Sequence, residues 1–242
     1  MTTKSCAMTL PYAKSDSYKV FDSIASRYDL INTVLSGGLH RIWRKELRRQ
    51  LPAQGSQIVL DLATGTADVA IELVKDPRVT KVVGVDLSQG MIAIGRQKIK
   101  RLQLGGQIQL QVGDAQKLSY TEGQFDAATM SFGIRNVPDV DACLREIFRV
   151  LKPGGRALVL EFALPKSPVM RRLHLFYLRN ILPIIGRMMS GHGTAYTYLN
   201  QTIEDFPYGE NFTSLMSQAG FRNASHKVLT FGIVNLYSGD KI

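Results

Sequence analysis

Cysteine is scarce in this sequence, and long apolar runs are missing from it. Only Cys6 and Cys143 are present among 242 residues, and they lie far apart, so neither a disulfide framework nor a metal site is expected. No segment approaches the roughly 20 uninterrupted apolar residues of a spanning helix. Residues 1–20 lack the continuous apolar core of a signal peptide. We therefore expect a cytoplasmic protein without a metal centre.

Glycine is missing from two positions of a turn that would otherwise form the dinucleotide fingerprint G-x-G-x-x-G. These positions hold Ala63 and Asp68. A pyrophosphate binds to bare amides at a helix N-terminus, where the carboxylate of Asp68 would repel it. Asp61 and Asp68 instead suit a cationic ligand, and S-adenosylmethionine, with its amino group and sulfonium, fits better than NAD. The alternative is an ordinary strand–turn–helix that binds nothing.

The residues around this turn form a strand–turn–helix followed by a second strand. The apolar run 58–62 leads into the small residues 63–66, and the run 83–86 ends at Asp86. In a βαβ unit, this pattern places a backbone-lined turn beneath a nucleoside and the second acid beside its ribose. Small residues let the main chain approach such a ligand closely.

Strands and helices alternate along the rest of the chain, which predicts an α/β fold with a doubly wound, mostly parallel sheet of seven strands. We expect strands at 58–62, 81–86, 108–112, 125–130, 157–162, 224–229 and 233–237, and helices at 68–74, 89–102, 140–151 and 212–219. The segment 152–155, Lys-Pro-Gly-Gly, is predicted to stop the third of these helices.

Two helical segments are not needed by the sheet. Residues 18–51 predict an N-terminal helical cap, interrupted at Ser36-Gly37-Gly38, and residues 165–201 predict a helical insertion. We expect a single domain over 1–242, in which these two segments cover the ligand site as a lid.

Basic residues outnumber acidic ones, giving a net charge of +10, and they gather in two clusters. The clusters are Arg41, Arg44, Lys45, Arg48 and Arg49, and then Lys166, Arg171, Arg172, Arg179 and Arg187. The second lies in an unusually apolar helical stretch, which favours an anionic membrane surface or a lipid-like substrate over nucleic acid. The alternatives are a solvated helix face, packing over the sheet, or a homodimer interface.

Three further segments carry a family resemblance. They are residues 28–32, Tyr-Asp-Leu-Ile-Asn, with Ser36, His40 and Trp43; residues 131–136; and residues 149–155, which lead to Glu161. With them, the chain resembles the ubiquinone/menaquinone biosynthesis C-methyltransferases, whose core is similar to that of other Rossmann-like class I methyltransferases. The resemblance extends from about Tyr18 to Lys241. The family usually has glycine at the positions of Thr64 and Ala67, where side chains tolerate positive φ poorly.

The resemblance implies C-methylation of a reduced polyprenyl quinone, demethylmenaquinol to menaquinol, with S-adenosylmethionine as methyl donor. The turn backbone and Thr66 would contact the methionine part, Asp86 the ribose, Asp114 and Ala115 the adenine, and Ser131 the reactive end. The full predicted cofactor set is Asp61, Gly65, Thr66, Asp68, Asp86, Asp114, Ala115 and Ser131. Each acid has the alternative role of a helix or turn cap.

The implied chemistry needs a ring hydroxyl to lose its proton so that the ortho carbon becomes nucleophilic. Because a phenol has a pKa near 10, it needs a base, a stabilised phenolate, or both. Arg135 is the candidate that stabilises the phenolate, and Asn136 the one that orients the ring oxygen or a water. His40 is the runner-up base, and its alternative is a structural histidine packed beside Trp43. No metal is needed, because the donor methyl is already activated.

Other functions stay open at this point. Within enzymes, they are the equivalent methylation of a polyprenyl benzoquinol in ubiquinone biosynthesis and methylation of another small molecule at O or N. From another class, the alternative is a non-catalytic basic module that binds a membrane or nucleic acid. The expected partners are the quinol and, transiently, the inner face of a membrane, without nucleic acid.

Overall fold

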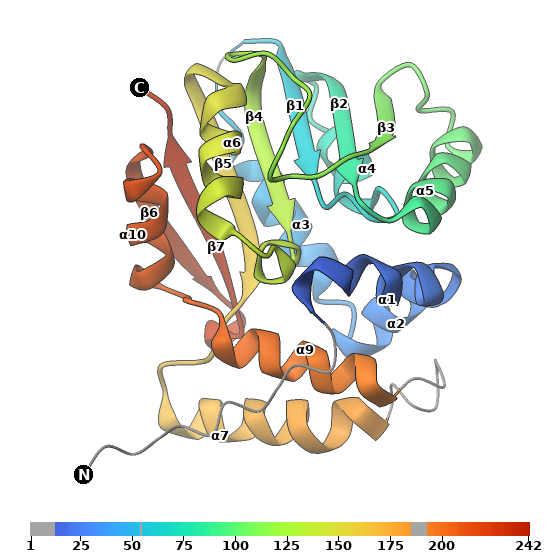
Figure 1. Cartoon of the computed structure of the whole chain (residues 1–242), viewed down its shortest axis with the longest axis vertical. Helices are drawn as coiled ribbons and strands as arrows, with labels where there is room; N and C mark the ends of the chain where they lie inside the picture. The colour runs from blue at the N-terminus through green and yellow to red at the C-terminus, as the bar shows by residue number, and fades with distance from the viewer. Residues whose placement is uncertain (1–12, 54, 185–192) are drawn as a thin grey trace.

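The computed structural model describes residues 13–53, 55–184 and 193–242, and the statements below concern these residues. Its centre is a seven-stranded sheet in the order β3-β2-β1-β4-β5-β7-β6 (Figure 1). The strands are β1 (Gln57–Leu62), β2 (Val79–Asp86), β3 (Ile108–Val112), β4 (Phe125–Ser131), β5 (Leu151–Phe162), β6 (Arg222–Leu229) and β7 (Val234–Asp240). Strands β1 to β5 pair in parallel, and β7 runs antiparallel to both its neighbours. The predicted α/β fold with a mostly parallel sheet is confirmed.

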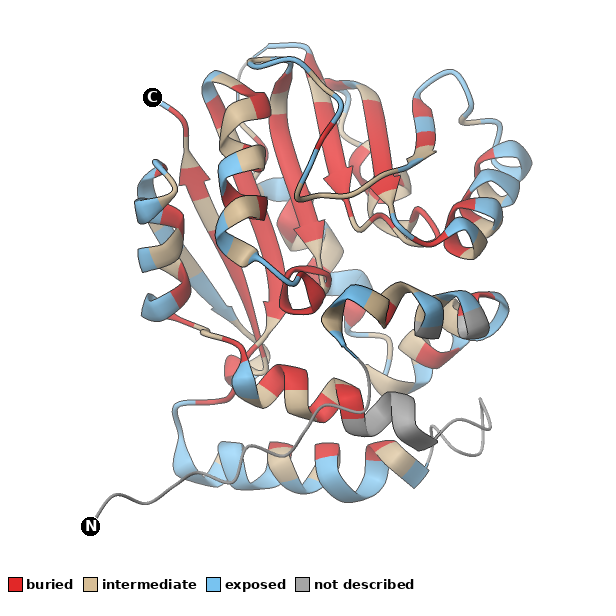
Figure 2. Ribbon diagram, in the orientation of Figure 1, coloured by how far each residue is buried: buried red, intermediate tan, exposed pale blue. Residues whose placement is uncertain are grey.

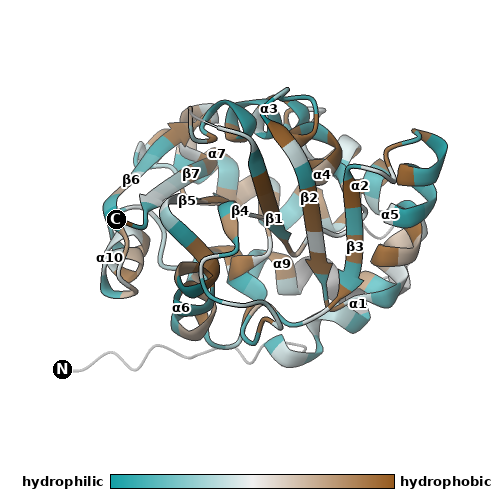
Figure 3. Cartoon of the chain, turned by 90° about the horizontal axis from the view of Figure 1, so that it is seen from above, coloured by the Kyte–Doolittle hydropathy of each residue, from teal (hydrophilic) through white to brown (hydrophobic). Residues whose placement is uncertain are grey.

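Helices cover both faces of the sheet and bury its central strands (Figure 2). One core cluster joins the sheet to α3 (His40–Arg49), α4 (Asp68–Leu73) and α5 (Gln89–Arg101). A second joins the opposite face to α6 (Val140–Val150) and α10 (Glu210–Gln218). Figure 3 shows hydrophobic residues concentrated in β1 and β2, whereas α5 carries hydrophilic ones. Strands buried on both faces are apolar throughout, which is why runs rather than alternation marked them in the sequence.

Strand β5 begins earlier than predicted. Helix α6 starts with the Asp139 carboxylate accepting a hydrogen bond from the Ala142 backbone at 2.8 Å, and it ends at Val150, one residue before the predicted end. Leu151 then pairs at once with Phe125, while the next paired residue of β5 is Arg156. The predicted start at residue 157 is therefore wrong. Pairing between β4 and β5 begins at Leu151, and residues 152–155 form a bulge within it.

The N-terminal cap contains more breaks than the single joint expected. It comprises η1 (Lys14–Asp16), α1 (Ser17–Ile24), η2 (Ala25–Arg27) and α2 (Tyr28–Leu35), and it leads into α3. The predicted joint is present between α2 and α3, where Gly37 and Gly38 both take positive φ. These are backbone conformations that glycine adopts without strain.

The insertion forms helices that pack against the cap. They are α7 (Pro168–Phe176), the π-helical turn η4 (Tyr177–Ile181) and α9 (Gly193–Asp205). The buried residues that join them to the cap are Ile31, Leu164, Leu178, Leu182 and Ile203. In Figure 1, α1, α2, α9 and α7 lie beyond the ends where β1 and β4 terminate. Short helical turns η3 (Ile134–Asn136) and η5 (Thr230–Gly232) complete this end of the molecule.

Candidate functional site

Two adjoining cavities lie between the carboxyl ends of the parallel strands and the helices beyond them. The first, of about 250 Å³, is lined by the ends of β2 and β4, the turn after β1, and α1. The second, of about 400 Å³, lies among α2, α3, α7 and α9. Both cavities are lined by Phe21, Tyr28, Ala63, Gly65, Ser131, Phe132 and Asn136. Because they share these walls, ligands in the two cavities would meet.

The turn after β1 takes its shape from three residues in the left-handed backbone conformation. Ala63, Gly65 and Ala67 have φ of 49°, 54° and 67°. Ala67 is one of the two positions where the resembling family usually has glycine, and a left-handed alanine costs roughly 1–2 kcal/mol. Thr64, the other position, keeps negative φ and donates a hydrogen bond to the Asp61 carboxylate at 2.6 Å. The threonine therefore fixes the turn through its side chain.

Asp61 holds this turn and lines neither cavity. Only 1% of it is exposed, and its two carboxylate oxygens accept hydrogen bonds from Thr64 and Thr129, each at 2.6 Å. Burial raises its pKa to about 6, against the lowering effect of these hydroxyls. Asp61 thus links the turn to β4.

Asp86 lies at the end of β2 and lines the first cavity. One carboxylate oxygen accepts a hydrogen bond from the Gly65 backbone at 2.8 Å, and the other accepts one from Ser88 at 2.9 Å. Burial raises its pKa, and these backbone hydrogen bonds oppose the rise. Each oxygen keeps a further lone pair, which a ribose hydroxyl can use.

The remaining walls of the first cavity suit an adenosine. Asp114 and Ala115 line it, and the Asp114 carboxylate accepts a hydrogen bond from the Gln116 backbone at 2.9 Å. Apolar side chains of Leu87 and Met91 complete this part of the wall. A pair of acids, a small-residue turn and an apolar slot are the groups that an adenosyl cofactor needs.

The Ser131 hydroxyl lies at the boundary between the two cavities. It is buried and has no hydrogen-bond partner among the described residues. Two residues later, a Cβ at Gly133 would overlap the Ala63 side chain, so only glycine lets this segment lie so close to the turn after β1. An orphaned hydroxyl at such a junction is placed to contact a ligand.

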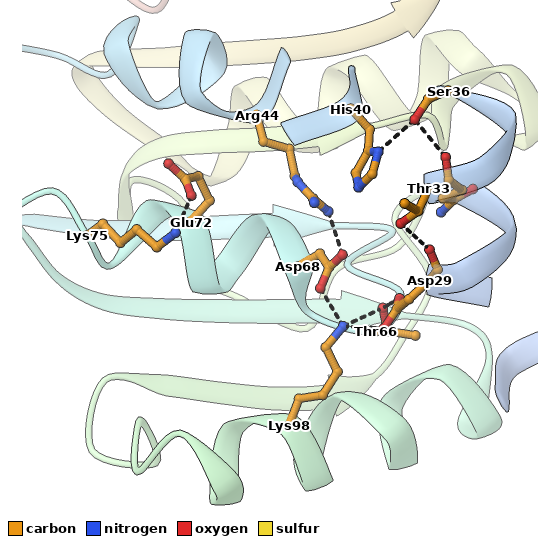
Figure 4. Close-up of polar contacts among 11 residues, drawn as sticks. Asp29, Thr33, Ser36, His40, Arg44, Thr66, Asp68, Glu72, Lys75 and Lys98 are labelled. Carbon is orange, nitrogen blue, oxygen red and sulfur yellow. Dashed lines mark hydrogen bonds and ion pairs between the residues drawn. The ribbon is translucent and has the colours of Figure 1, made fainter. Parts of the chain in front are cut away.

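Thr66 and Asp68 line the second cavity, and Figure 4 shows their polar contacts with Asp29, Arg44 and Lys98. Lys98 contacts both Asp68 and Asp29, and Arg44 lies 2.5 Å from the Asp68 carboxylate. Thr66 donates a hydrogen bond to Asp29 at 2.6 Å. Burial would raise the pKa of Asp68, but Arg44 and Lys98 outweigh it and lower the pKa. These two residues therefore tie α2 to α3, α4 and α5.

His40 begins α3 and lines the second cavity. Its Nδ1 lies 2.6 Å from the Ser36 hydroxyl, which itself donates to the Asn32 carbonyl at 2.7 Å. Because that hydroxyl has one hydrogen, it must accept from Nδ1–H, which leaves Nε2 as the bare nitrogen of a neutral ring. Burial, assisted by Arg44, lowers the pKa of His40. Its tautomer and charge are those of a base.

Arg135 is a buried cation in the wall of the second cavity. Its guanidinium donates to Glu161 at 2.6 Å and to the Phe132 carbonyl at 2.7 Å, and it stacks over Phe162 with 5.4 Å to the ring centroid. Within the described residues, neither its Nε nor the Oδ1 of neighbouring Asn136 has a partner. The cation is held in place, while polar atoms of both residues are left for a ligand.

Aromatic side chains that the sequence did not mark as functional enclose this end of the second cavity. Trp43, Phe132 and Phe162 form a cluster with centroid separations of 5.8, 6.3 and 4.6 Å. Tyr28 stands where the cavities meet. The resembling segments contain Tyr28, Trp43 and Phe132, so membership of those segments was the available signal, whereas Phe162 joins them only through the fold.

Sequence comparisons relate the chain to known methyltransferases. Residues 11–241 match the model of the ubiE/COQ5 methyltransferase family. The chain is 44% identical, over 92% of its own length and 94% of the relative's, to the ubiquinone/menaquinone biosynthesis C-methyltransferase UbiE of Citrifermentans bemidjiense. It is 39% identical, over 92% and 91%, to the demethylmenaquinone methyltransferase of Bacteroides fragilis.

Solved structures show the same fold. A SAM-dependent methyltransferase of Thermotoga maritima superposes with a TM-score of 0.64, covering 93% of this chain and 100% of that one. At 20% sequence identity, this likeness concerns the fold alone.

Proposed function

The chain belongs to the ubiE/COQ5 methyltransferase family, and on this premise we propose that it transfers a methyl group from S-adenosylmethionine to a ring carbon of a reduced polyprenyl quinone. The observation that carries the proposal is the meeting of a nucleoside-shaped cavity with a larger apolar one at shared residues. Names of relatives include both menaquinone and ubiquinone biosynthesis. Demethylmenaquinol is the acceptor we propose, with the corresponding benzoquinol as second candidate.

The first cavity has the residues to hold S-adenosylmethionine, which supplies a methyl group on a positively charged sulfur. Asp86 would accept hydrogen bonds from the ribose hydroxyls, and Asp114 and Ala115 would bind the adenine. The Gly65 backbone would lie beneath the methionine part, and Ser131 would lie toward the second cavity. These contacts orient the donor toward the acceptor and hold the two reactants together, which by itself lowers the barrier.

The second cavity suits an aromatic ring with an aliphatic tail. The cluster of Trp43, Phe132 and Phe162 offers flat apolar surface to a ring. Residues of α7 and α9, among them Leu178 and Leu199, extend the apolar wall. By excluding water, such walls strengthen every electrostatic interaction at the reacting end.

The proton of the ring hydroxyl goes to His40. Its Nε2 is the bare nitrogen, and Ser36 fixes that tautomer through Nδ1. The Arg135 guanidinium stabilises the phenolate that forms, while Asn136 orients the ring oxygen. With negative charge on its oxygen, the ring becomes nucleophilic at the ortho carbon. That carbon gains the methyl group as the carbon–sulfur bond of the donor breaks, and a neutral thioether is the leaving group. The carbon then loses its hydrogen as a proton to solvent, which restores the aromatic ring, and the ring oxygen takes its proton back from His40.

Transfer of labelled methyl to a chemically reduced quinol tests this proposal. We expect the label on a ring carbon, with the naphthoquinol and the benzoquinol compared under the same anaerobic conditions. Label on a ring oxygen, or no label on either ring, would contradict the proposal. The ratio of the two rates decides which ring the enzyme prefers.

We also propose that the protein meets its substrate at an anionic membrane surface. No helix in the described part of the chain is long and apolar enough to cross a membrane, whereas a polyprenyl tail keeps the quinol in the bilayer. The outer side of α7 is largely exposed (Figure 2) and combines Arg171 and Arg172 with the apolar side chains of Leu173 and Phe176, each 58% exposed. Each surface cation contributes about 1 kcal/mol against an anionic leaflet.

Some cations of the two basic clusters are engaged in ion pairs within the protein. Arg179 pairs with Glu204 at 2.6 Å, and Arg44 pairs with Asp68, so neither is available as a free charge. Arg187 lies outside the described residues. Lys166, Arg171 and Arg172 of the second cluster are exposed and are in none of these pairs, so they carry the proposed contact.

Co-sedimentation with liposomes tests the surface contact. Binding should rise with the anionic lipid fraction, fall with salt, and weaken in the double variant Arg171→Glu, Arg172→Glu. The matched control is Lys100→Glu, Arg101→Glu, which makes the same charge change at the far end of α5 and should sediment like the wild type. Sedimentation that ignores lipid charge, or a concentration-dependent dimer that covers α7, would contradict the proposal.

A further inference from the structure

The second cavity contains a polar group that the reaction described above does not use, the imidazole of His174. This residue lies on α7, which exposes Arg171 and Arg172 to solvent and directs His174 toward the cavity. Only 6% of His174 is exposed, and it lines the second cavity. Its Nε2 is buried and has no hydrogen-bond partner among the residues that the structure describes.

An unsatisfied nitrogen at this place is costly. A buried polar atom without a partner costs about 1–3 kcal/mol, and an apolar side chain would fill the same wall without that cost. Three other buried polar atoms without described partners also line the cavities, on Ser131, Arg135 and Asn136. Those three come from β4 and η3, at the reacting end. His174 comes from the separate helical layer, so it serves a different part of the ligand.

A reduced quinone has two hydroxyl groups, and they lie para to each other across the ring. When one lies beside the acceptor carbon, at His40, Arg135 and Asn136, the other points to the opposite side of the ring. There it enters a cavity whose walls are mostly apolar. A hydroxyl buried without a partner would weaken binding, so this second group needs a hydrogen bond of its own.

We infer that His174 Nε2 binds the second hydroxyl of the quinol and thereby fixes the orientation of the ring. Burial lowers the pKa of His174, so the ring is neutral near pH 7 and accepts or donates through Nε2 without a net charge. The contact makes the enzyme selective for dihydroxy rings over rings with one hydroxyl. This inference rests on the proposed function, since it assigns a specificity-determining residue to the same site.

A pair of substrates and a pair of variants test the inference. One substrate is the quinol, and the other is its analogue with only the hydroxyl beside the acceptor carbon. The wild type should prefer the quinol in kcat/KM by at least about tenfold, since a hydrogen bond in an apolar site is lost with the analogue. His174→Leu should remove this preference and leave the rate with the analogue nearly unchanged. His174→Gln, whose amide still forms hydrogen bonds, should restore part of it.

Binding gives a second readout that needs no turnover. Trp43 is the only tryptophan of the chain and lines the second cavity, so its fluorescence should report occupancy by either ligand. We expect His174→Leu to raise the dissociation constant of the quinol about tenfold and that of the analogue little. Val169→Ala serves as the control on the same helix, because Val169 is 69% exposed and lines neither cavity.

The outcomes separate the role of His174 from the proposed methyl transfer. Equal losses with both substrates, or a preference that survives in His174→Leu, would overturn the role of His174 while methyl transfer stands. Methylation of neither substrate by the wild type would overturn the proposed function. In that case, the fluorescence comparison still decides whether His174 distinguishes the two rings.

Discussion

The two cavities of this protein lie at the same end of the sheet, but different kinds of element form their walls. The first is made mainly of strand ends and the turns that follow them, with backbone amides of Gly65 and Ser88 holding Asp86. Most walls of the second come from helices far apart in the sequence. The first is therefore fixed by the parallel sheet itself, whereas the second exists only when separate helices pack together.

The contacts that close the second cavity are correspondingly long-range. Tyr177 of η4 donates to the Leu35 carbonyl of α2 at 2.7 Å. Lys98 of α5 pairs with Asp29 of α2. A variant in one cavity should thus leave ligand binding in the other intact, and the predictions below test that separation.

The largest effect is expected at His40. His40→Ala should lower kcat by about 10²–10⁴-fold, the usual contribution of a general base, and leave the dissociation constant of the cofactor unchanged. Ser36→Ala, which removes only the group that fixes the tautomer, should have a smaller effect. Calorimetry with the cofactor and single-turnover rates measure the two quantities separately.

The pH dependence of kcat/KM tests whether His40 acts as the base. The base works only when neutral, so kcat/KM should be lost as the pH falls through its pKa. Because burial and Arg44 lower that pKa, this acid limb should lie below pH 6.5, the reference value for histidine. A profile without this limb, together with near-normal turnover in His40→Ala, would reject the assignment.

Glu161→Gln should destabilise the protein strongly, because Glu161 is the buried partner of Arg135 in the wall of the second cavity. The variant leaves the buried Arg135 cation without its partner, and breaking such pairs costs about 3–5 kcal/mol. Urea unfolding measures the change. The double variant Glu161→Gln, Arg135→Met removes both charges and should recover much of the stability without recovering turnover. No recovery in the double variant would argue against charge as the cause.

Asp61→Asn should change the pH dependence of stability. Since the folded pKa of Asp61 is raised to about 6, above the value of 3.8 expected when unfolded, the folded state binds more protons between these values. Its contribution to stability therefore falls as the pH rises from 4 to 6, by on the order of 2–3 kcal/mol. The asparagine variant should lack this fall in urea titrations across that range. An identical slope in both proteins would place the raised pKa elsewhere.

Asp86→Ala should affect the first cavity alone. Loss of the carboxylate leaves the ribose hydroxyls without their acceptor, which should weaken cofactor binding by about 2 kcal/mol, some thirtyfold. Quenching of Trp43 by the quinol should remain as in the wild type. Because Asp86 also holds two backbone amides, circular dichroism must first show a folded variant. Parallel losses in both cavities would show that they are coupled.

The sequence alone determined the sheet, its strands and the position of the first cavity. The apolar runs 58–62 and 81–86 become β1 and β2 because strands buried on both faces must be apolar. Parallel strands end at one edge, so Gly65, Asp86, Asp114, Ala115 and Ser131 meet around one cavity. Local pattern was sufficient here, because the geometry of the sheet leaves little freedom.

Only the tertiary structure decided the rest of the site. The sequence favoured Asp61 and Asp68 as groups for a cationic ligand, and only the fold shows their partners within the protein. Asp61 accepts hydrogen bonds from Thr64 and Thr129, and Asp68 pairs with Arg44 and Lys98. The place of His174 in an apolar helix did not show which way its side chain faces. The packing of α7 directs it toward the second cavity. Side chains that are far apart in the sequence leave no periodic signal of their contact, because that contact depends on how the helices pack against one another.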